Sequence, residues 1–382
     1  MKIGIDIRVI GKKRTGDEVY FFNLVKNLAK LDKENIYYLY TNREPEKDES
    51  LKKEIDKLAL GNNFKVIYIN SPNRFWWNFR SLPNYLKKNP VDIFHTQYIA
   101  PFWLPKNIKL ILTIHDISFN FYPQYIKKSD LFFLKTLLPR SLRRADKIIT
   151  VSKNERKNII DFYKIPSEKV EFAYNGVDFE KFNKKYSPEE IKKIKSRYSL
   201  PATRYILYVG TLQPRKNIPA LVEILKIYRE KYSNEDLKLV IVGNRRARNF
   251  DKKIDGVIKK HNLRNEVIFP GWIEDEDLPA VYKLAHCFVF ASLYEGFGIP
   301  IAEAMAAGLP VVSSNKSCLP EVGKDAAIFV DPANRAQFAE KIHEVIANKN
   351  FRADLVQKGT SLARTYSWGK TAKDTLGIYN SL

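Results

Sequence analysis

Residues 286–308 read HCFVFASLYEGFGIPIAEAMAAG and join an apolar run, a glycine-rich turn and a helical pattern. Pro300 suits the first turn of a helix and Gly308 suits its end, so Gly296 and Gly298 lie just before a helix N-terminus. The amides and the dipole at such a terminus favour an anion, and glycines let a diphosphate approach closely. The stretch therefore predicts a strand, a turn and a helix that together bind phosphate.

Two glutamates flank this turn. Glu303, about one turn into the predicted helix, can accept hydrogen bonds from a ribose diol, and Glu295, in the preceding loop, can do the same for sugar hydroxyls. Glutamates around a strand–helix turn can also be solvated surface charges. The glycines and apolar residues around this pair favour a binding site.

A second loop carries cations. Residues 210–217, GTLQPRKN, directly follow the apolar run RYILYV. Arg215 and Lys216 suit a diphosphate whose negative charge grows as a glycosidic bond breaks, and Lys216 is the better candidate of the two. An exposed basic turn is the structural alternative.

The whole chain alternates short β-branched and aromatic runs with amphipathic stretches of helix length, which is typical of parallel α/β domains. Strands are predicted near 2–8, 36–41, 64–69, 91–95, 109–114, 147–151 and 170–174, and near 204–209, 238–243, 266–269, 286–290, 310–313 and 326–330. Helices are predicted at 335–347, 351–364 and 366–379. The charged stretch 184–200 has no strand pattern and marks a candidate domain junction. Ligands of such sheets bind beyond the carboxyl ends of the strands, where both loops lie.

The composition, 45% apolar and 28% charged with a mean hydropathy of −0.35, is that of a globular protein. No apolar run is long enough to span a membrane, and the opening MKIGIDIRVI reads as a strand and not as a signal peptide, so we expect a cytoplasmic protein. Cys287 and Cys318 are too few for a disulfide framework or a zinc cluster.

The formal net charge is +22, and residues 60–170 contain 19 Lys and Arg against 7 Asp and Glu. Nucleic acid, an anionic membrane surface and phosphorylated substrates are all possible partners of such a region. A generally basic proteome is the alternative explanation of the charge.

Several motifs occur in a fixed order: the Thr15-Gly16 loop, Leu112-Thr-Ile-His115-Asp, Asn175-Gly-Val-Asp, the GT-x3-RKN loop, Glu295-x7-Glu303 and the terminal Tyr-Ser-Trp-Gly-Lys segment. As a set they resemble the retaining glycosyltransferases of family 4, which have the GT-B fold, over nearly the whole chain. The GT-x3-RKN form is similar to a subgroup with many mannosyl- and rhamnosyltransferases of cell-surface polysaccharide assembly.

The resemblance implies two Rossmann-like, doubly wound domains that face each other across a cleft. Residues 1–183 would bind the acceptor, 184–200 would be a linker, 201–365 would bind the nucleotide sugar, and a crossover helix at 366–382 would return to the N-terminal domain.

It also implies roles for individual residues. Gly16 would lie close to the donor, His115 beside the transferred sugar, and Arg215 and Lys216 at the diphosphate, while Glu295 would bind the sugar hydroxyls and Glu303 the ribose. The backbone around Gly296, Phe297, Gly298 and Ile299 would complete the pocket. His115, Lys216 and Glu295 are the expected catalytic residues.

The chain departs from the family pattern in two places. Thr211 stands where many members have arginine, so Arg215 would supply that charge. Asp17 and Glu18 follow Gly16, where Ile-Gly-Arg is common, and this puts the local acceptor contacts in doubt. His115 and Asp116 could also be a satisfied histidine and a helix cap.

The implied reaction moves a hexose, mannose-like by the subgroup resemblance, from a GDP- or UDP-linked sugar to a glycan or lipid-linked acceptor. No carboxylate is placed as a nucleophile, so we expect retention by a same-face route in which the departing diphosphate, held by Lys216, helps to remove the acceptor proton. We expect no cofactor and no metal, because the cations and the helix terminus neutralise the diphosphate.

Two other functions stay open. An epimerase or sugar-phosphate synthase on the same fold would release the sugar to water or to a phosphate. A basic nucleic-acid-binding protein is the alternative from another class, but no recognised nucleic-acid module is visible, so we expect no nucleic-acid partner. The start IGIDIRVIG lacks GxGxxG, which argues against a nicotinamide enzyme.

Residues 73–80 read NRFWWNFR, which places Trp76 and Trp77 between Arg74 and Arg80. Further basic residues follow at Lys87, Lys88, Arg140, Arg143 and Arg144. Tryptophans flanked by arginines are typical of a bilayer interface. We expect Arg74, Trp76, Trp77 and Arg80 to contact the inner face of the cytoplasmic membrane or the acceptor. Packing of both tryptophans inside the domain is the structural alternative.

Overall fold

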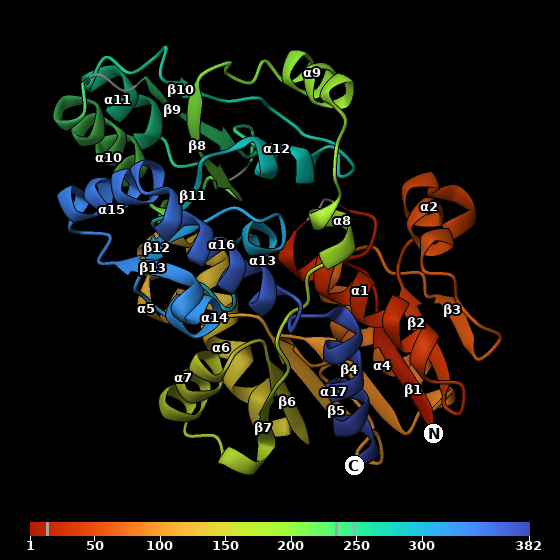
Figure 1. Cartoon of the computed structure of the whole chain (residues 1–382). Coiled ribbons are helices and arrows are strands. Elements are labelled where there is room, and N and C mark those ends of the chain that lie inside the picture. The colour runs from red at the N-terminus through yellow and green to blue at the C-terminus, as the bar shows by residue number, and fades with distance from the viewer. Residues whose placement is uncertain (13–14, 234–235, 248) are drawn as a thin grey trace. The chain divides into compact units, whose positions relative to one another are not determined.

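The computed structural model describes residues 1–12, 15–233, 236–247 and 249–382, which form two compact units (Figure 1). The first unit comprises Met1–Gly176 and Trp368–Leu382, and the second comprises Val177–Ser367. Each unit is built on a parallel sheet with helices on its faces, so the predicted α/β class is confirmed.

The first sheet has the order β3-β2-β1-β4-β5-β6-β7, and all its pairs are parallel. Its strands are β1 (Lys2–Asp6), β2 (Ile36–Thr41), β3 (Phe64–Tyr68), β4 (Ile93–Gln97), β5 (Lys109–Ile114), β6 (Lys147–Thr150) and β7 (Val170–Phe172). Central strands such as β5 are buried after their first residue because helices cover both faces. The order reverses between β1 and β4, where a doubly wound sheet binds ligands.

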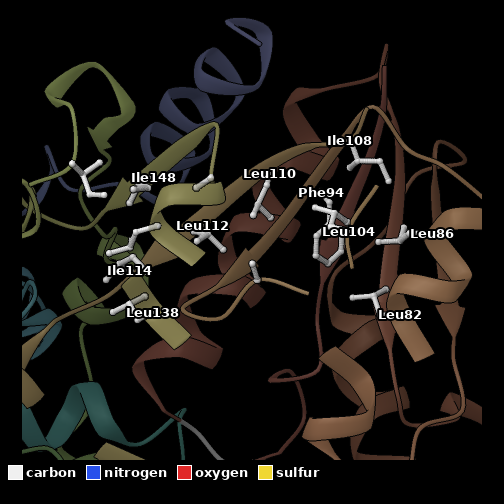
Figure 2. Packing of buried hydrophobic residues seen from close by; sticks show 14 of the residues in the cluster. Leu82, Leu86, Phe94, Leu104, Ile108, Leu110, Leu112, Ile114, Leu138 and Ile148 are labelled. Carbon is white, nitrogen blue, oxygen red and sulfur yellow. The ribbon is translucent and has the colours of Figure 1, made fainter. Parts of the chain in front are cut away.

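The helices of the first unit are α1 (Gly16–Leu31), α2 (Glu49–Lys57), α3 (Arg74–Trp76), α4 (Leu82–Lys88), α5 (Ser118–Phe121), α6 (Lys128–Arg144), α7 (Lys153–Tyr163) and α17 (Trp368–Asn380), with a π-helical turn at Trp77–Ser81. Figure 2 shows side chains of β4 and β5 packed with Leu82 and Leu86 of α4 and Leu138 of α6. This core holds the carboxyl ends of the central strands in place.

The C-terminal helix α17 packs along α1 within the first unit. The hydroxyl of Tyr379 lies 2.6 Å from Nδ1 of His95 on β4, and the hydroxyl of Thr371 donates to the carbonyl of Tyr174 at 2.6 Å. Helix α17 therefore completes the core of the unit that also contains the N-terminal strands.

The second sheet has the order β10-β9-β8-β11-β12-β13 and is also parallel throughout. Its strands are β8 (Arg204–Val209), β9 (Leu237–Val242), β10 (Val267–Ile268), β11 (Cys287–Phe290), β12 (Val311–Ser314) and β13 (Ala327–Val330). The order reverses between β8 and β11. In both sheets a strand lies at every predicted position, with ends that differ by at most two residues.

The helices of the second unit are α8 (Phe179–Asn183), α9 (Pro188–Arg197), α10 (Ile218–Lys231), α11 (Lys253–Lys260), α12 (Leu278–Leu284), α13 (Ile299–Ala306), α14 (Leu319–Gly323), α15 (Arg335–Ala347) and α16 (Lys349–Ala363). Helix α9 lies inside the charged stretch 184–200 and begins with a capping box between Ser187 and Glu190. Among the described residues, no helix combines the length and the apolar character that crossing a bilayer requires.

Candidate active site

Two loops of the second unit meet where the order of its sheet reverses. After β8 the chain runs through Gly210 to a 3-10 turn, η5 (Pro214–Lys216), and after β11 it enters the glycine-rich loop before α13. Because β8 and β11 are parallel neighbours, their carboxyl ends lie at the same edge. The amide of Leu293 donates to the carbonyl of Arg215 at 2.8 Å and joins the two loops directly.

Lys216 and Glu295 form a buried ion pair between these loops. The ammonium of Lys216 lies 2.5 Å from Oε1 and 2.6 Å from Oε2 of Glu295. Burial by itself would raise the pKa of Glu295, but the charges of Lys216 and Arg215 outweigh it, so its pKa is lowered and the carboxylate is ionised. The sequence assigned these two residues to different parts of a donor and did not predict that they bind each other.

Arg215 supports the same pair from the side. Its Nη1 donates to the carbonyl of Tyr294 at 2.7 Å and lies 3.4 Å from Oε2 of Glu295. Two cations therefore converge on one carboxylate, which leaves this part of the site with a net positive charge suited to a diphosphate.

Supporting residues that the sequence did not single out fix the loop of Glu295. The hydroxyl of Ser317 donates to the carbonyl of Glu295 at 2.5 Å, and the thiol of Cys318 lies 3.1 Å from the same oxygen. Both follow β12, which neighbours β11. The sequence could have indicated Ser317 and Cys318, because they follow the predicted strand 310–313. Polar side chains at the end of a strand can hold a neighbouring loop in place.

Helix α13 begins at Ile299, as the positions of Pro300 and Gly308 predict. Gly298 before it has φ = +90°, and a Cβ built there would lie 2.9 Å from Cδ2 of Leu319. Gly296 is buried in the same turn, and the Phe297 ring packs edge-on against Tyr366 with centroids 5.4 Å apart. Phe297 therefore uses its side chain for packing, and the backbone of this turn is the part that can bind a ligand.

Glu303 lies in the second turn of α13 and is buried. Its Oε2 accepts a hydrogen bond of 2.8 Å from the hydroxyl of Tyr282 on α12. Tyr282 orients the carboxylate and is a further residue that the sequence did not single out.

His115 belongs to the first unit and directly follows β5, as predicted. Its Nε2 lies 3.2 Å from Oε1 of Gln97 and 3.8 Å from Oδ1 of Asp17, and the ring of Tyr20 packs edge-on against it at 5.0 Å. Asp116 accepts hydrogen bonds from both the amide and the hydroxyl of Ser118, the first residue of α5. Asp116 therefore fixes the turn that precedes α5, while His115 has polar partners from two other elements.

A second histidine, which the sequence did not single out, lies behind His115. His95 is fully buried, with Nδ1 2.6 Å from the hydroxyl of Tyr379 and Nε2 2.7 Å from Oγ1 of Thr113. Burial lowers its pKa to about 3, so the imidazole is neutral.

Gly16 is the first residue of α1, and a Cβ built there would meet no atom within 4 Å. Glu18 accepts a hydrogen bond of 2.6 Å from the amide of Gly11 and so fixes the loop after β1. Asp17 faces His115. Of the two acidic residues that depart from the family pattern, one is therefore structural and the other lies beside the histidine.

The aromatic and basic group at 73–80 divides into an exposed and a buried part. Arg74, Trp76 and Arg80 are exposed, and the Arg80 guanidinium lies 5.9 Å from the Trp76 ring centroid. Trp77 is fully buried beneath Arg8, which excludes it from a membrane contact and corrects the prediction for this residue. Successive residues of a helical turn point in directions about 100° apart, so adjacent tryptophans need not share a face.

No group of three or more His, Cys, Asp or Glu side chains among the described residues is arranged to hold a metal ion.

Two parallel α/β units, one with a lysine–glutamate pair before a glycine-capped helix, define a protein of the GT-B class. The model named "Glycosyl transferases group 1" matches residues 190–362, and "Glycosyltransferase Family 4" matches residues 14–181. The O-antigen chain mannosyltransferase B of Escherichia coli is 30% identical over 316 residues, which are 81% of this chain and 78% of the relative. The chain therefore belongs to glycosyltransferase family 4.

Two further comparisons agree with this membership. The O-antigen chain mannosyltransferase RfbU of Salmonella typhimurium is 28% identical over 235 residues, which are 61% of this chain and 60% of that protein. The crystal structure of Anabaena Alr3699/HepE in complex with UDP and glucose has a TM-score of 0.75 with 18% sequence identity and full coverage of both chains. The structural match supports the GT-B fold, and the chain is a glycosyltransferase.

Proposed function

We propose that this glycosyltransferase moves a mannose-like hexose from a nucleotide diphosphosugar to a glycan or lipid-linked acceptor of a cell-surface polysaccharide, with retention at the anomeric carbon. The buried pair of Lys216 and Glu295 carries the proposal, because it holds a cation and an ionised carboxylate within one hydrogen bond of each other before the N-terminus of α13. The names of the two mannosyltransferase relatives support the choice of sugar and product.

Each part of the donor has a matching group in the second unit. The diphosphate would bind Lys216, Arg215 and the amides at the start of α13, and the ribose would bind Glu303. Glu295, kept ionised by its neighbours, accepts hydrogen bonds from sugar hydroxyls. The name of the Anabaena protein's crystal structure, with UDP and glucose, is consistent with a nucleotide-sugar donor, and the present residues suit GDP and UDP equally.

Lys216 also gives the site a way to favour the transition state. As the glycosidic bond breaks, negative charge develops on the diphosphate oxygen, and an ammonium already fixed by Glu295 stabilises it without reorganisation. The departing diphosphate then takes the proton of the acceptor hydroxyl on the same face of the sugar. The cations supply the charge that a metal would otherwise bring to this step, so we propose a reaction that needs no metal ion.

The acceptor side would be formed by the first unit, with His115 beside the transferred sugar. We further propose that the protein works in the cytoplasm at the inner face of the cytoplasmic membrane. Phe75 stacks on Phe79 at 4.1 Å, and Phe79 stacks on Phe102 at 3.8 Å, which together with Arg74, Trp76 and Arg80 gives an aromatic and basic surface. Arg144 does not belong to this surface, because it is half-buried and donates to the carbonyl of Ile108 at 3.0 Å.

Incubation with single nucleotide sugars tests the function. We expect one donor to raise the melting temperature and to be slowly hydrolysed, with release of a sugar whose anomeric configuration, followed by NMR, is that of the donor. Release of the opposite anomer would exclude retention, and conversion of the donor to an epimer without transfer would support the epimerase alternative.

Flotation with liposomes tests the membrane contact separately. We expect binding to anionic vesicles that falls with salt, and weaker binding of Arg74→Gln with Arg80→Gln. Equal binding to neutral vesicles would exclude an electrostatic contact and leave the proposed reaction untouched.

A further inference from the structure

Two side chains from different elements contact the same nitrogen of His115. Gln97 is the last residue of β4, and its Oε1 lies 3.2 Å from Nε2 of His115. Asp17 lies in the first turn of α1, and its Oδ1 lies 3.8 Å from the same nitrogen. The other ring nitrogen, Nδ1, is therefore the one that faces away from these two contacts.

The chemistry of the contacting atoms decides where the ring carries its proton. The amide oxygen of Gln97 and the carboxylate of Asp17 can only accept a hydrogen bond. A neutral imidazole has one N–H, which then lies on Nε2, and its Nδ1 has a lone pair and is an acceptor. Gln97 is close enough for a hydrogen bond, while the carboxylate of Asp17 attracts the N–H through its charge.

His95 on the same face of the sheet shows a different arrangement. His95 and Thr113 lie two residues before Gln97 and His115 on the neighbouring chain segments of β4 and β5, so the two pairs share a face. Both ring nitrogens of His95 have partners in the core, the hydroxyls of Tyr379 and Thr113. His115 has a hydrogen bond at Nε2 alone among the described residues.

Nδ1 of His115 can be reached by a ligand. The side chain of His115 is 11% exposed, whereas His95 is fully buried. The fully buried polar atoms that lack a partner do not include Nδ1 of His115, so this nitrogen is accessible to solvent. The structure thus leaves an accessible acceptor at the end of β5.

Aromatic rings hold the plane of this imidazole. Tyr20 and Phe21 of α1 pack edge-on against it, with centroids 5.0 and 6.3 Å away, and the ring of Tyr98 lies at 6.0 Å. Neighbours on these sides hinder the rotation that would exchange Nδ1 and Nε2. The ring therefore presents Nδ1 in a constant direction.

The turn after β4 is strained. Tyr98 has φ = +54°, a left-handed conformation that bulky residues rarely adopt. The amide of Ile99 donates to the carbonyl of Gln97 at 2.6 Å and closes a three-residue turn around Tyr98. Strained residues concentrate at functional sites, where the surrounding structure holds them in place. Here the turn fixes Gln97 and brings the Tyr98 ring to His115.

The place in the sheet connects these residues to the substrate. In the order β1-β4-β5, Asp17 follows β1, Gln97 ends β4 and His115 follows β5, so all three lie at the carboxyl edge, where ligands of such sheets bind. An acceptor nitrogen at this edge suits a hydroxyl, which can donate a hydrogen bond. A carboxylate in the same place would meet a lone pair and the negative charge of Asp17.

We propose that Gln97 and Asp17 are positioning residues, which hold the proton of His115 on Nε2 and present Nδ1 as an acceptor to a hydroxyl of the transferred sugar. The enzyme is thereby selective for a neutral hexose over the corresponding uronic acid. This selectivity rests on the proposed function, whereas the position of the proton is a property of the protein alone.

NMR of the full chain labelled with ¹⁵N-histidine tests the proton position without any ligand. Spectra are recorded above the midpoint of the His115 titration, where the ring is neutral, and His115→Ala assigns the signal. We expect a ring N–H signal coupled to Nε2, because a hydrogen bond to an oxygen slows its exchange with water. Gln97→Leu should lose this signal, and Gln97→Glu, which keeps an acceptor oxygen, should retain it.

Three results of this measurement overturn the proposal. They are an N–H signal on Nδ1, the absence of any His115 N–H signal in the wild-type protein, and an unchanged Nε2 signal in Gln97→Leu.

Initial rates test the positioning role of Asp17 in turnover. We expect Asp17→Ala to lower kcat ~10-fold, the low end of the cost of losing a partner that orients a histidine, with unchanged Kd for nucleoside diphosphate. Glu49→Ala is the matched control, because Glu49 is an exposed acid in the first turn of α2 and its loss changes a helix terminus in the same way. Wild-type turnover of Asp17→Ala, or an equal loss in Glu49→Ala, contradicts the role.

Paired donors test the selectivity. Rates are compared for a nucleotide hexose and its uronic acid, GDP-mannose with GDP-mannuronic acid or UDP-glucose with UDP-glucuronic acid, whichever neutral donor the protein uses. We expect wild type to prefer the neutral donor at least ~10²-fold and Asp17→Ala to reduce this preference roughly 5-fold, the scale of one charge repulsion near a protein surface.

An equal preference in wild type and Asp17→Ala overturns the selectivity. If the protein turns over no nucleotide sugar but the Nε2 signal depends on Gln97 as expected, the proposed function fails while the proton position stands.

Discussion

The two sheets place an ion pair at the same topological position but build it differently. In the second unit, Lys216 and Glu295 come from the loops after β8 and β11, lie 79 residues apart and are buried. In the first unit, Asp6 is the last residue of β1 and Arg8 lies only two residues further on. Both pairs lie where the sheet order reverses, between β8 and β11 and between β1 and β4.

The difference concerns what holds each cation in place. Lys216 is held by contacts between two loops, so its ammonium is displaced if either loop moves. Arg8 depends on a local turn, on the Trp77 ring beneath it and on Thr96 of β4. We therefore expect substitutions at the pair in the second unit to affect stability and chemistry together, and substitutions in the first unit to separate them.

The largest effect is expected for Lys216→Ala. It leaves the buried Glu295 with Arg215 alone, 3.4 Å away, which should cost up to about 3–5 kcal/mol of unfolding free energy. It also removes the charge that stabilises the departing diphosphate, so turnover should fall by ~10³-fold. Chemical denaturation and initial rates measure the two effects.

The double variant Lys216→Met with Glu295→Gln distinguishes the effect on stability from the effect on turnover. Neutralising both partners should restore most of the stability while turnover stays low. Recovery of turnover along with stability would mean that Lys216 is structural only.

His115→Ala should affect the chemistry without the fold. The residue has polar neighbours but lies at the strand end and not in the core, so we expect a melting temperature close to that of wild type and unchanged affinity for nucleoside diphosphate. Turnover should fall at least ~10²-fold, a typical result of losing one contact to the transition state. An unfolded variant would favour the alternative of a core histidine.

Glu303→Ala should act on donor binding alone. Loss of the carboxylate removes the proposed ribose contact, and we expect the Kd of the nucleoside diphosphate to rise ~10-fold. Tyr282→Phe is the matched control, because it removes the 2.8 Å hydrogen bond that orients Glu303 but keeps the carboxylate. Its effect should be smaller than that of Glu303→Ala, and an equal or larger one would assign the site to Tyr282.

Much of this arrangement could be predicted from the sequence because parallel strands repeat a simple rule. Apolar runs buried on both faces gave the strand positions, and the carboxyl ends of parallel strands lie together, so loops such as 210–217 and 291–298 had to meet. The start of α13 followed from Pro300 and Gly308.

The partners of individual side chains could not be predicted in this way. The direct bond between Lys216 and Glu295 depends on how two loops pack, and the burial of Trp77 beside an exposed Trp76 depends on the rotation of a π-helical turn. The hydrogen bond of Arg43 to the carbonyl of Gly11, which joins the loops after β2 and β1, depends on loop packing in the same way.

The last prediction concerns pH, whose effect is smallest near neutrality, and it again separates the units. His95 has a pKa of about 3 in the folded first unit, because burial excludes the charged imidazole, against 6.5 for an unburied histidine. Between pH 6.5 and 3, this imidazole is therefore protonated in the unfolded chain but not in the folded chain. Stability should fall as the pH drops through this window, by up to ~1.4 kcal/mol per pH unit from this residue.

Burial also lowers the pKa of His286 in the second unit, so a pH-dependent melting curve alone does not isolate His95. The NMR signals of the two histidine rings distinguish His95 from His286. We expect the His95 ring, bonded to Tyr379 and Thr113, to show no titration between pH 8 and 4.5 while the protein is folded. A midpoint near 6.5 would show that water reaches this ring, and the helix α17 that covers it would then be loosely attached to the first unit.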